Sequence, residues 1–464
     1  MTDPVSALAE IVPDAWLVGG TVRDRVLGRE TADFDVATAG SAGDVARAVG
    51  RAAGGFAFEL SEAFGAWRVV AHDRTWQVDV LPLNGATIEE DLGRRDLTIN
   101  AVAAPLGSLG YVDPFGGLED LSRRRLRAVS PMAFERDPLR TLRLARLACE
   151  LGFEADPGTQ GLARAAAPGL TEVAPERVFA ELRRVVCAPA ALSGLQLMDA
   201  IGVTDVILPE LSALRGVQQS RFHHLDVSDH TRSVLAEVIA LEADPERLAG
   251  ADAAVLARFL DEPLANDLTR AQALRFGALL HDIAKPQTRA VTPQGRITFM
   301  GHDEAGARLA AEILGRLRAS ERLREHVAAL ARHHLRLGFL VHEMPLSRRA
   351  VYDYLHVTAP VAVDVTVLSV ADRLATRGDN AERAIASHLE LARQMLAEGL
   401  AWIADPPRPP VRGDELAQAL GIQPGPVVGD LLAELEAASF SGEVATREEA
   451  IARARELIAS HQGG

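Results

Sequence analysis

The order of apolar and polar residues changes along the chain near residue 131. Before that point, short apolar runs separated by turn residues predict strands at "AWLVGG", "DFDVAT", "WRVVAH" and "WQVDVLPL", the last two paired as a hairpin. The segment "TVRDRVLG", closed by Gly28, predicts a short helix between the first two strands. The pattern therefore predicts an N-terminal region that mixes strands and helices.

Beyond that point the strand signals end and apolar residues recur at helical spacing. "PLRTLRLARLACELG" predicts a helix that ends at Gly152, and "PERVFAELRRVV" predicts one with Pro175 near its start. The proline-rich residues 404–413 predict a boundary, and Thr446 with Glu449 three residues later predicts a capping box. The fold class predicted is α+β, with a small N-terminal α/β head followed by a long all-helical body.

The charge of the chain narrows the classes of partner. A net charge of −15 excludes a generally basic nucleic-acid binder. Residues 121–190, however, carry 12 arginines against 8 acidic residues, whereas residues 1–120 carry 9 against 19. We interpret this as a phosphate-binding surface beside an acidic, metal-holding site, although solvated helix faces also account for most of these charges.

The cysteines and the N-terminus indicate the compartment. Cys149 and Cys187 lie in apolar helical contexts and form no CxxC pair, which favours buried thiols in a reducing environment. The first residues have no basic segment typical of a signal peptide, and no apolar run approaches the length of about 20 residues that spans a membrane. We expect a cytoplasmic protein without a membrane segment.

The predicted strand "DFDVAT" carries two carboxylates. Because side chains alternate along a strand, Asp33 and Asp35 lie on one face and Phe34 points into the core. Two carboxylates on one face repel each other unless a cation lies between them, and Mg²⁺ combines such oxygen ligands with substrate phosphates. The pair therefore predicts a Mg²⁺ site.

The segment before this strand predicts a phosphate cradle. Gly19 and Gly20 allow the backbone to approach a ligand at the start of the short helix, and Arg23 lies in its first turn. A surface turn with two acidic residues is the alternative, but it leaves the glycines and the arginine unexplained. The combination points to metal-assisted nucleotidyl transfer.

The segment "EEDLGRRDLTINAVA" adds further polar candidates. Arg94, Arg95 and Asp96 lie between strand and helix patterns, and Asn100 follows. The planar fork of arginine suits phosphate. A solvated run of charges is the alternative interpretation.

A third group of candidates lies in "ERDPLRTLRLARL". Asp137, Arg140 and Arg143 are spaced three residues apart, close to one helix face. A carboxylate that accepts and a guanidinium that donates hydrogen bonds can together recognise the Watson–Crick edge of a base. An intrahelical salt bridge is an equally good account of the spacing.

These segments carry a family resemblance. The chain resembles the class II tRNA nucleotidyltransferase and poly(A) polymerase family, most closely its bacterial CCA-adding enzymes. The resemblance covers most of the chain and rests on "LVGGTVRDRVLGRETADFDVAT", "EEDLGRRDLTINAVA", "VDPFGGLEDL", "RDPLRTLRLARLACELGF", "VAPERVFAELRR" and "GIQPGPVVGDLLAELEAASFSGEVATREEA".

The resemblance implies an activity and a role for each matching residue. Asp33 and Asp35 would be catalytic and hold Mg²⁺, and Asp137 with Arg140 would pair with the incoming base. The chain would add CTP, CTP and ATP to the tRNA 3′ end without a nucleic-acid template. The nucleotide would be bound by Gly19, Gly20, Arg23, Arg95, Asp96, Asn100, Asp137, Arg140 and Arg143.

The sequence departs from the family pattern in two places. Arg136 stands where the family often has Glu, directly before the base-reading acid. Only "NGATI" separates "WQVDVLPL" from the acidic run, where many CCA-adding enzymes have a longer flexible loop associated with the switch from C to A addition. Enzymes that add only CC resemble this short form, so a CC-adding enzyme is an alternative, and a poly(A) polymerase is a weaker one.

Histidines and acids recur along the helical body. They lie in "HHLDVSDHT", "LLHDIAKP", "FMGHDEAG", "ARHHLRLG" and "LSVADRLAT", and imidazole and carboxylate ligands on successive helices suit a divalent transition metal, in addition to Mg²⁺ in the head. This set resembles the HD phosphohydrolase superfamily. The matching metal positions are His230, His281, Asp282 and Asp372, with His302 and His333 as candidate ligands of a second site. The alternatives are a metal-dependent phosphohydrolase acting on tRNA-end or cyclic phosphates, and a helical scaffold that helps to hold tRNA.

These observations predict four parts. Residues 1–130 would form the nucleotidyltransferase head, 131–215 a helical neck that binds nucleotide and RNA, 216–400 an HD-type helical domain, and 411–464 a helical C-terminal tail. The expected partners are the tRNA 3′ end, CTP and ATP. The sequence does not indicate an oligomeric state.

Overall fold

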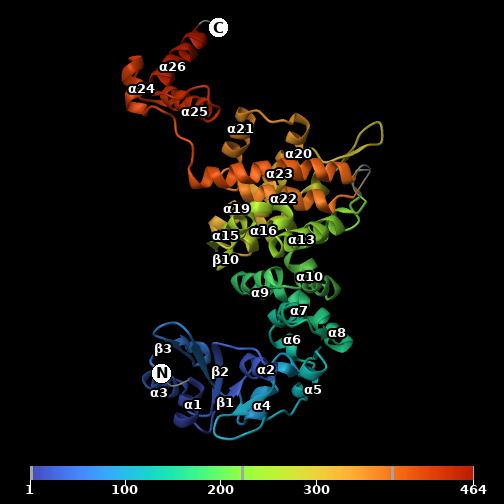
Figure 1. Cartoon of the computed structure of the whole chain (residues 1–464). Helices are drawn as coiled ribbons and strands as arrows, with labels where there is room; N and C mark the ends of the chain where they lie inside the picture. Colours follow the sequence, from blue (N-terminus) through green and yellow to red (C-terminus); the bar gives the residue numbers. More distant parts are fainter. Residues whose placement is uncertain (1–3, 221–223, 378–380, 463–464) are drawn as a thin grey trace. The chain divides into compact units, whose positions relative to one another are not determined.

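The computed structural model describes residues 4–220, 224–377 and 381–462. The chain divides into two compact units, Met1–Ile207 and Leu208–Gly464, which are described separately (Figure 1).

The first unit begins with a mixed sheet, drawn in blue in Figure 1. Six strands lie in the order β3-β4-β5-β2-β1-β6; β2 and β5 run parallel and the other neighbours antiparallel. The strands are β1 (Trp16–Val18), β2 (Asp33–Thr38), β3 (Gly55–Ser61), β4 (Ala66–Ala71), β5 (Gln77–Pro82) and β6 (Ala103–Pro105). The predicted hairpin is confirmed as β4 and β5.

Helices around this sheet begin and end at residues suited to those positions. The Ser41 side chain accepts a hydrogen bond from the Asp44 amide at the start of α3, and Gly54 closes that helix with a left-handed φ of 78°. Valines on α3 pack with valines of β4 and β5 in one buried core, against which Phe34 also packs, as predicted. The helices of the head are α1 (Pro4–Ile11), α2 (Gly20–Val26), α3 (Ala42–Ala53) and α4 (Ile88–Leu92), followed by the 3₁₀ turn η2 (Thr98–Asn100).

The rest of the first unit is mainly helical. The expected helices are present as α7, which ends at a left-handed Gly152, and α9, which begins at Pro175. The neck contains α5 (Gly117–Ser122), β7 (Arg125–Leu126), α6 (Ala133–Arg136), α7 (Leu139–Leu151), β8 (Glu154–Ala155), α8 (Pro157–Ala166), η3 (Ala167–Glu172), α9 (Pro175–Cys187), α10 (Ala191–Ala200) and α11 (Val203–Ile207). Helices α7, α9 and α10 pack on one another and bury Cys149, while Cys187 is half-buried.

The second unit is built from helices, with two small two-stranded sheets. Its helical body includes α12 (Pro209–Ser212), α13 (Val227–Ala243), α14 (Glu246–Ala249), α15 (Ala253–Leu260), α16 (Arg270–Leu280), α17 (Lys285–Thr288), α18 (His302–Arg316), α19 (Glu321–His333), α20 (Arg336–Leu340), α21 (Arg348–Thr358), α22 (Ala362–Ala375) and α23 (Ala381–Ala404). Helix α22 is buried along most of its length and packs against α13, α16 and α23. The two small sheets pair β9 (Pro263–Ala265) with β10 (Leu268–Thr269), and β11 (Ala290–Val291) with β12 (Ile297–Thr298).

The tail has its own small core of apolar residues. It contains α24 (Gly413–Leu420), α25 (Pro426–Phe440) and α26 (Arg447–Gln462). The predicted capping box is confirmed: the Glu449 amide donates to Thr446 Oγ1 at 3.2 Å, and the Thr446 amide donates to Glu449 Oε2 at 3.1 Å.

The fold class α+β is confirmed, with a mixed sheet confined to the head and helices beyond it. Among the described residues, no single helix has the length and apolar composition to cross a membrane; α21 and α22 reach them only as a pair bent by 99°. The strands β3 and β6 were not predicted, and the four-part division stays a prediction.

Candidate active site

The two acids of β2 lie where that strand begins. Asp33 is exposed and Asp35 half-buried, and Thr21 of α2 holds the strand in place. The Thr21 hydroxyl donates to the Asp33 carbonyl at 3.2 Å and accepts from the Asp35 amide at 2.7 Å. Burial raises the pKa of Asp35, and the carboxylate of Asp79 adds to this rise while Arg95 opposes it. A cation beside these carboxylates would relieve that cost.

A third carboxylate, Asp79, faces the same place and was missed by the sequence analysis. It lies opposite Asp35 in the parallel pair of β2 and β5. Arg68 of β4 donates to both oxygens of Asp79, at 2.6 and 2.7 Å. The signal in the sequence was the single acid in "WQVDVLPL", but only the pairing of β5 with β2 brings it to the site.

The glycine turn allows charged groups to approach the backbone closely. Gly19 has φ of 66°, and a Cβ built there would lie 2.9 Å from Arg95 Nη1 and 3.1 Å from Asp35 Oδ2. Arg23 donates from Nη1 to Asn100 Oδ1 at 2.9 Å, which joins α2 to η2. Glycine therefore suits this turn, because another residue would be strained at this positive φ and its Cβ would lie too close to Arg95.

Asp96 is buried, and its carboxylate binds two neighbouring side chains and a backbone amide. Its Oδ2 pairs with Arg143 Nε at 3.0 Å, and its Oδ1 accepts from the Asn100 side chain at 3.0 Å and the Leu97 amide at 2.8 Å. Burial would raise the pKa of Asp96, but Arg143 and these hydrogen bonds hold it well below its usual range. Asp96 thus fixes Arg143 and Asn100 at the site.

The third predicted group differs from expectation in its local structure. Asp137 is not on the face of α7: it precedes Pro138, in extended backbone between α6 and α7. Its Oδ2 pairs with Arg177 of α9 at 3.1 Å, a partner that the sequence analysis did not single out. Arg140 instead donates to the carbonyls of Arg94, Arg95 and Ala133, and Arg143 pairs with Asp96. Among the described contacts, an ion pair within Asp137, Arg140 and Arg143 is not found.

One cavity of about 500 Å³ gathers the predicted residues of the first unit. Arg94, a candidate of the sequence analysis, is not part of its lining. The lining does include every residue expected to bind metal or nucleotide there: Gly19, Gly20, Arg23, Asp33, Asp35, Arg95, Asp96, Asn100, Asp137, Arg140 and Arg143. Residues not expected there are Thr21, Asp24, Thr31, Arg68, Gln77, Asp79, Arg146, Glu181 and Arg184. Below, this cavity is called the nucleotide cavity.

A cluster of imidazoles and carboxylates is buried in the second unit. His281, His302 and His334 each place Nδ1 2.7–2.9 Å from a backbone carbonyl, on Ala278, Phe299 and Ala331. With Nδ1 as the donor, each Nε2 presents a lone pair toward the centre of the cluster. The Nε2 atoms of His302 and His334 lie 3.3 Å apart and both face Asp282 Oδ1, at 3.3 and 3.7 Å.

The other predicted members complete this cluster. His230 Nε2 lies 3.0 Å from Asp372 Oδ1 and 3.7 Å from Asp282 Oδ2. Lys285, the only lysine of the chain, pairs with Asp282 Oδ2 at 2.6 Å. Despite burial, His281 and Lys285 hold the pKa of Asp282 well below its usual range. Two groups of ligand atoms close enough for one ion are His230 with His281 and Asp282, and Asp282 with His302 and His334.

His334, not His333, belongs to the second of these groups. The expectation for His333 is therefore wrong: its Nδ1 accepts from Arg336 Nε at 2.9 Å instead. Burial, reinforced by nearby His281, lowers the pKa of His334 to about 4, so its imidazole is neutral near pH 7, as a metal ligand must be.

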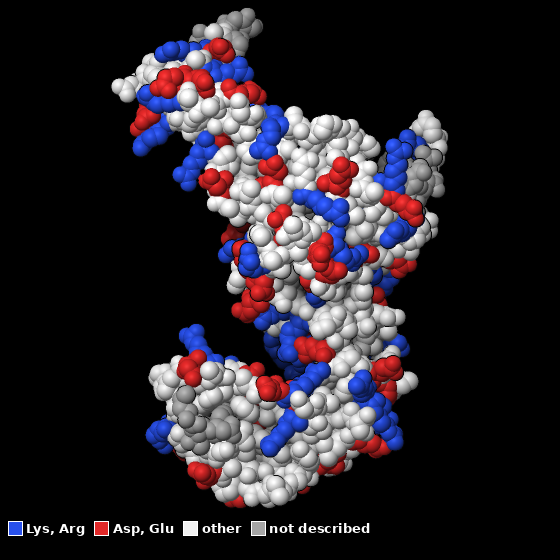
Figure 2. Space-filling model, in the orientation of Figure 1, with Lys and Arg blue, Asp and Glu red and all other residues white. Residues whose placement is uncertain are grey.

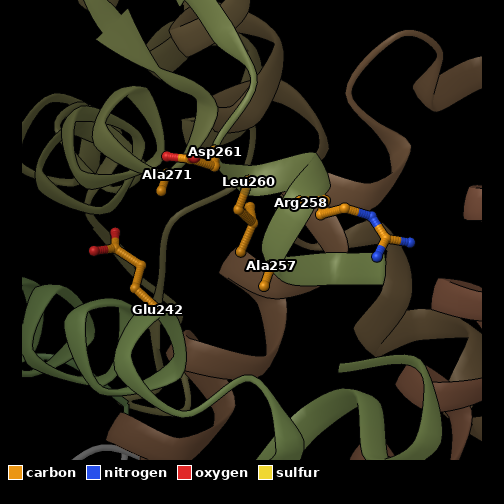
Figure 3. A pocket seen from close by; sticks show the side chains of 6 residues that line it. All are labelled: Glu242, Ala257, Arg258, Leu260, Asp261 and Ala271. Atoms are coloured by element: carbon orange, nitrogen blue, oxygen red, sulfur yellow. The ribbon is translucent and has the colours of Figure 1, made fainter. Parts of the chain in front are cut away.

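The second unit also contains a cavity of about 400 Å³, whose lining shares no residue with the histidine cluster. Figure 3 shows Glu242 on one side of it and Leu260 and Arg258 of α15 on the other. Burial raises the pKa of Glu242, against the effect of Arg275, which pairs with it at 2.6 Å. The Glu242 carboxylate is thus already paired with a guanidinium.

Figure 2 shows basic and acidic side chains interspersed on the visible face of the chain, so charged sites are local.

Comparisons with known proteins show the family and the fold of the chain. A Poly A polymerase head domain matches residues 15–81 and 68–127, a "probable RNA and SrmB- binding site of polymerase A" matches 152–214, and an HD domain matches 233–377. A solved structure of a CCA-adding enzyme in an apo form has the same fold, with a TM-score of 0.66 at 20% identity over 98% of this chain and 92% of that one.

Two curated relatives extend over nearly the whole chain. The A-adding tRNA nucleotidyltransferase of Deinococcus radiodurans is 36% identical over 444 residues, 94% of each protein. The CC-adding tRNA nucleotidyltransferase of Thermus thermophilus is 37% identical over 444 residues, 94% of this chain and 92% of the relative. The chain therefore belongs to the bacterial tRNA nucleotidyltransferase family, within the class that shares the poly(A) polymerase head, and it is an enzyme of that family.

Proposed function

We propose that the chain builds the CCA end of tRNA by adding CTP, CTP and ATP to the 3′ terminus. The observation that supports this is the nucleotide cavity, whose lining brings together the β2 carboxylates with Asp137 and Arg140, the proposed base-reading pair. Membership of the family implies a divalent metal. Oxygen ligands from Asp33 and Asp35, with the raised pKa of Asp35, fit Mg²⁺ in particular.

Within this proposal the chain's residues divide the work. Asp33 and Asp35 hold the Mg²⁺, which when bound supplies positive charge for the phosphates and the reacting hydroxyl. Arg23 and Arg95 lie beside the glycine turn and orient the triphosphate. Asp96 keeps Arg143 and Asn100 in place.

Base selection needs no nucleic acid in this arrangement. Asp137 accepts and Arg140 donates hydrogen bonds, which is the combination needed to read a Watson–Crick edge. Three backbone carbonyls fix the Arg140 guanidinium, so its orientation is set before a nucleotide arrives.

A second candidate function is the addition of CC alone. It is favoured by the short connection of residues 83–87 between β5 and α4, and by the likeness to a CC-adding relative at 37% identity. The likeness to an A-adding relative at 36% identity leaves the terminal step open to direct measurement.

The experiment is nucleotide incorporation with Mg²⁺ on two tRNAs, one lacking CCA and one ending in CC. Labelled CTP alone, ATP alone and both together are supplied. Two C and one A on the first tRNA support the full reaction, and two C without A support the second candidate. Addition of A only to the tRNA ending in CC would overturn both in favour of an A-adding enzyme, and no incorporation at all would overturn the proposal.

We further propose that the buried cluster of the second unit holds a divalent transition metal. Its ligands are His230, His281, Asp282 and Asp372, with His302 and His334 completing the set, because the imidazole lone pairs and carboxylates converge there. The imidazole of His281 and the carboxylate of Asp282 are almost fully buried, which favours an ion that joins the helices over a hydrolytic site. A cytoplasmic location is part of the proposal, and the buried Cys149 thiol is consistent with it.

A further inference from the structure

A larger cavity, about 760 Å³ in volume, adjoins the nucleotide cavity. The two cavities share Asp137 and Arg140, so they meet at the proposed base-reading pair. The larger one is called the second cavity below. A nucleoside triphosphate that places its phosphates at Asp33 and Asp35 and its base at Asp137 is accounted for by the nucleotide cavity alone. The second cavity therefore has room for another ligand.

One wall of this cavity is an aromatic ring without a role in the core. Phe64 ends the 3₁₀ turn Glu62–Phe64 between β3 and β4, and it is 75% exposed. It does not belong to the apolar cluster of the head, whose buried residues come mainly from the sheet and from α1, α2 and α3. An exposed ring beside a charged pocket is the usual platform on which an unpaired nucleobase stacks.

The remaining wall is basic. Arg94, Arg136 and Arg177 line it and are all exposed. Arg94 donates to Asn84 at 2.6 Å and Arg177 pairs with Asp137, whereas the Arg136 side chain has no ion pair among the described residues. Since the Arg140 guanidinium is held by three carbonyls, these three arginines are the cavity's groups for an added phosphate.

We propose that this cavity binds an unpaired nucleotide of the RNA acceptor strand, upstream of the reacting 3′-hydroxyl. Its base stacks on Phe64, and its phosphates lie among Arg94, Arg136 and Arg177. This assignment rests on the proposed function, because it requires an RNA acceptor to enter the head. The short connection of residues 83–87, which contributes Asn84 to the wall, leaves the cavity open to the strand.

The test separates RNA binding from catalysis. Asp33→Ala serves as the background variant, because it removes the proposed metal ligand and leaves the second cavity intact. Binding of a fluorescent tRNA lacking CCA is measured by anisotropy without nucleotide, in this background variant and in the same variant with Phe64→Ala or Arg136→Ala added. We expect each added change to weaken RNA binding, Phe64→Ala about tenfold or more. Arg136→Ala should also reduce the slope of log K against log salt concentration by about 0.7.

Matched controls and a rescue guard against misfolding. Phe56→Ala removes a ring on β3 that is 65% exposed and lies outside the cavity, and Arg51→Ala removes an exposed arginine of α3; both should leave RNA binding unchanged. Phe64→Trp should restore binding, because it restores a stacking surface. In enzymes with Asp33 intact, Phe64→Ala should raise KM for the tRNA and leave KM for CTP unchanged.

Two results would overturn the inference. The first is that Phe64→Ala, added to the Asp33→Ala background, leaves RNA binding equal to that of the background variant. The second is that Phe64→Ala raises KM for CTP without changing KM for tRNA, which would assign the cavity to the nucleotide. Failure of the proposed function looks different: the wild-type chain would incorporate no nucleotide, whatever the binding results.

Discussion

The nucleotide cavity of the first unit and the histidine cluster of the second unit both combine acids with basic partners, but they differ in access. Asp33 is exposed and Asp35 half-buried, in a cavity of about 500 Å³. In the cluster, His281 and Asp282 are 0% and 2% exposed. A site that must admit and release a large anion has to stay open, whereas one that keeps an ion can be closed.

The two regions also treat their carboxylates differently. Burial and Asp79 raise the pKa of Asp35, so its charged form is costly until a cation arrives. In the cluster, the effect of burial on Asp372 is outweighed by His230, which lowers its pKa below the usual range. Asp35 would therefore gain from a bound cation, whereas the charge of Asp372 is already offset by its neighbour His230. Under the two proposals above, similar residue types would serve ligand exchange in one region and metal retention in the other.

The largest expected effect separates the two regions by catalysis. Asp33→Ala removes a carboxylate from the metal site and should lower the rate of CTP incorporation by about a thousandfold. The double change His281→Ala with Asp282→Ala should leave that rate unchanged, since it lies in the other unit. Single-turnover incorporation of labelled CTP measures both. If the double variant also loses incorporation while its circular dichroism stays native, the two sites are not independent.

The next effect concerns metal retention within the cluster. His334→Ala removes a converging Nε2 and should weaken metal binding by more than about a hundredfold, beyond the loss usual for residues that only support a ligand. The matched control is its neighbour: His333→Ala removes an imidazole that accepts from Arg336 and should keep the metal. Elemental analysis of the purified proteins after dialysis provides the measurement. Equal metal content in both variants would contradict the assignment.

A smaller effect concerns stability and pH in the head. Asp96→Asn removes the charge that pairs with Arg143, which is 39% exposed, and should lower the free energy of unfolding at pH 7 by about 2 kcal/mol. Because the folded pKa of Asp96 is depressed, its contribution is fully present above the unfolded pKa of about 4 and is lost as the pH falls below it. Urea unfolding at pH 7, 5 and 3 should therefore show the gap between wild type and variant narrowing in acid.

Asp44→Asn is the control for that experiment. It breaks the pair with Arg47, whose side chains are 75% and 46% exposed, and should leave unfolding unchanged. If the difference in unfolding free energy between wild type and Asp96→Asn stays constant with pH, the shape of the Asp96 side chain, not its charge, accounts for its contribution to stability.

The smallest effect should leave both regions untouched. Thr446→Ala removes one half of the capping box at the start of α26 and should lower stability by about 1 kcal/mol. Incorporation and metal content should match those of the wild type, and a thermal scan should show the loss. Thr446→Ser, which keeps the capping oxygen, should restore stability. A change in either activity would mean that the tail is coupled to one of the sites.

Much of the site could be predicted because it follows from local rules. Alternation along β2 placed Asp33 and Asp35 together, and helix signals placed Gly152 and Pro175 at helix ends. Asp79 escaped prediction because β5 comes next to β2 only through a parallel pairing of strands distant in sequence. Contacts of that kind depend on the whole sheet and have no local signature.

The errors at helix ends have a similar origin. The spacing from Asp137 to Arg143 predicted a common helix face, but Pro138 begins the helical turn, so Asp137 falls outside it and meets Arg177 instead. His333 and His334 are neighbours at the end of α19, where a step of one residue turns the side chain by about 100°. A pattern of histidines cannot resolve that step without the packing of α18 against α19.

The single lysine gives the chain an unusual chemical surface. Lys285 is 6% exposed and joined to Asp282 and Gln219, so its ε-amine is sheltered as well as unique. Reagents that acylate amines therefore find, apart from the chain's α-amino group, almost nothing to modify on a protein whose other basic side chains are arginines and histidines. A dye or a solid support coupled through amines would therefore leave every arginine of the nucleotide cavity intact.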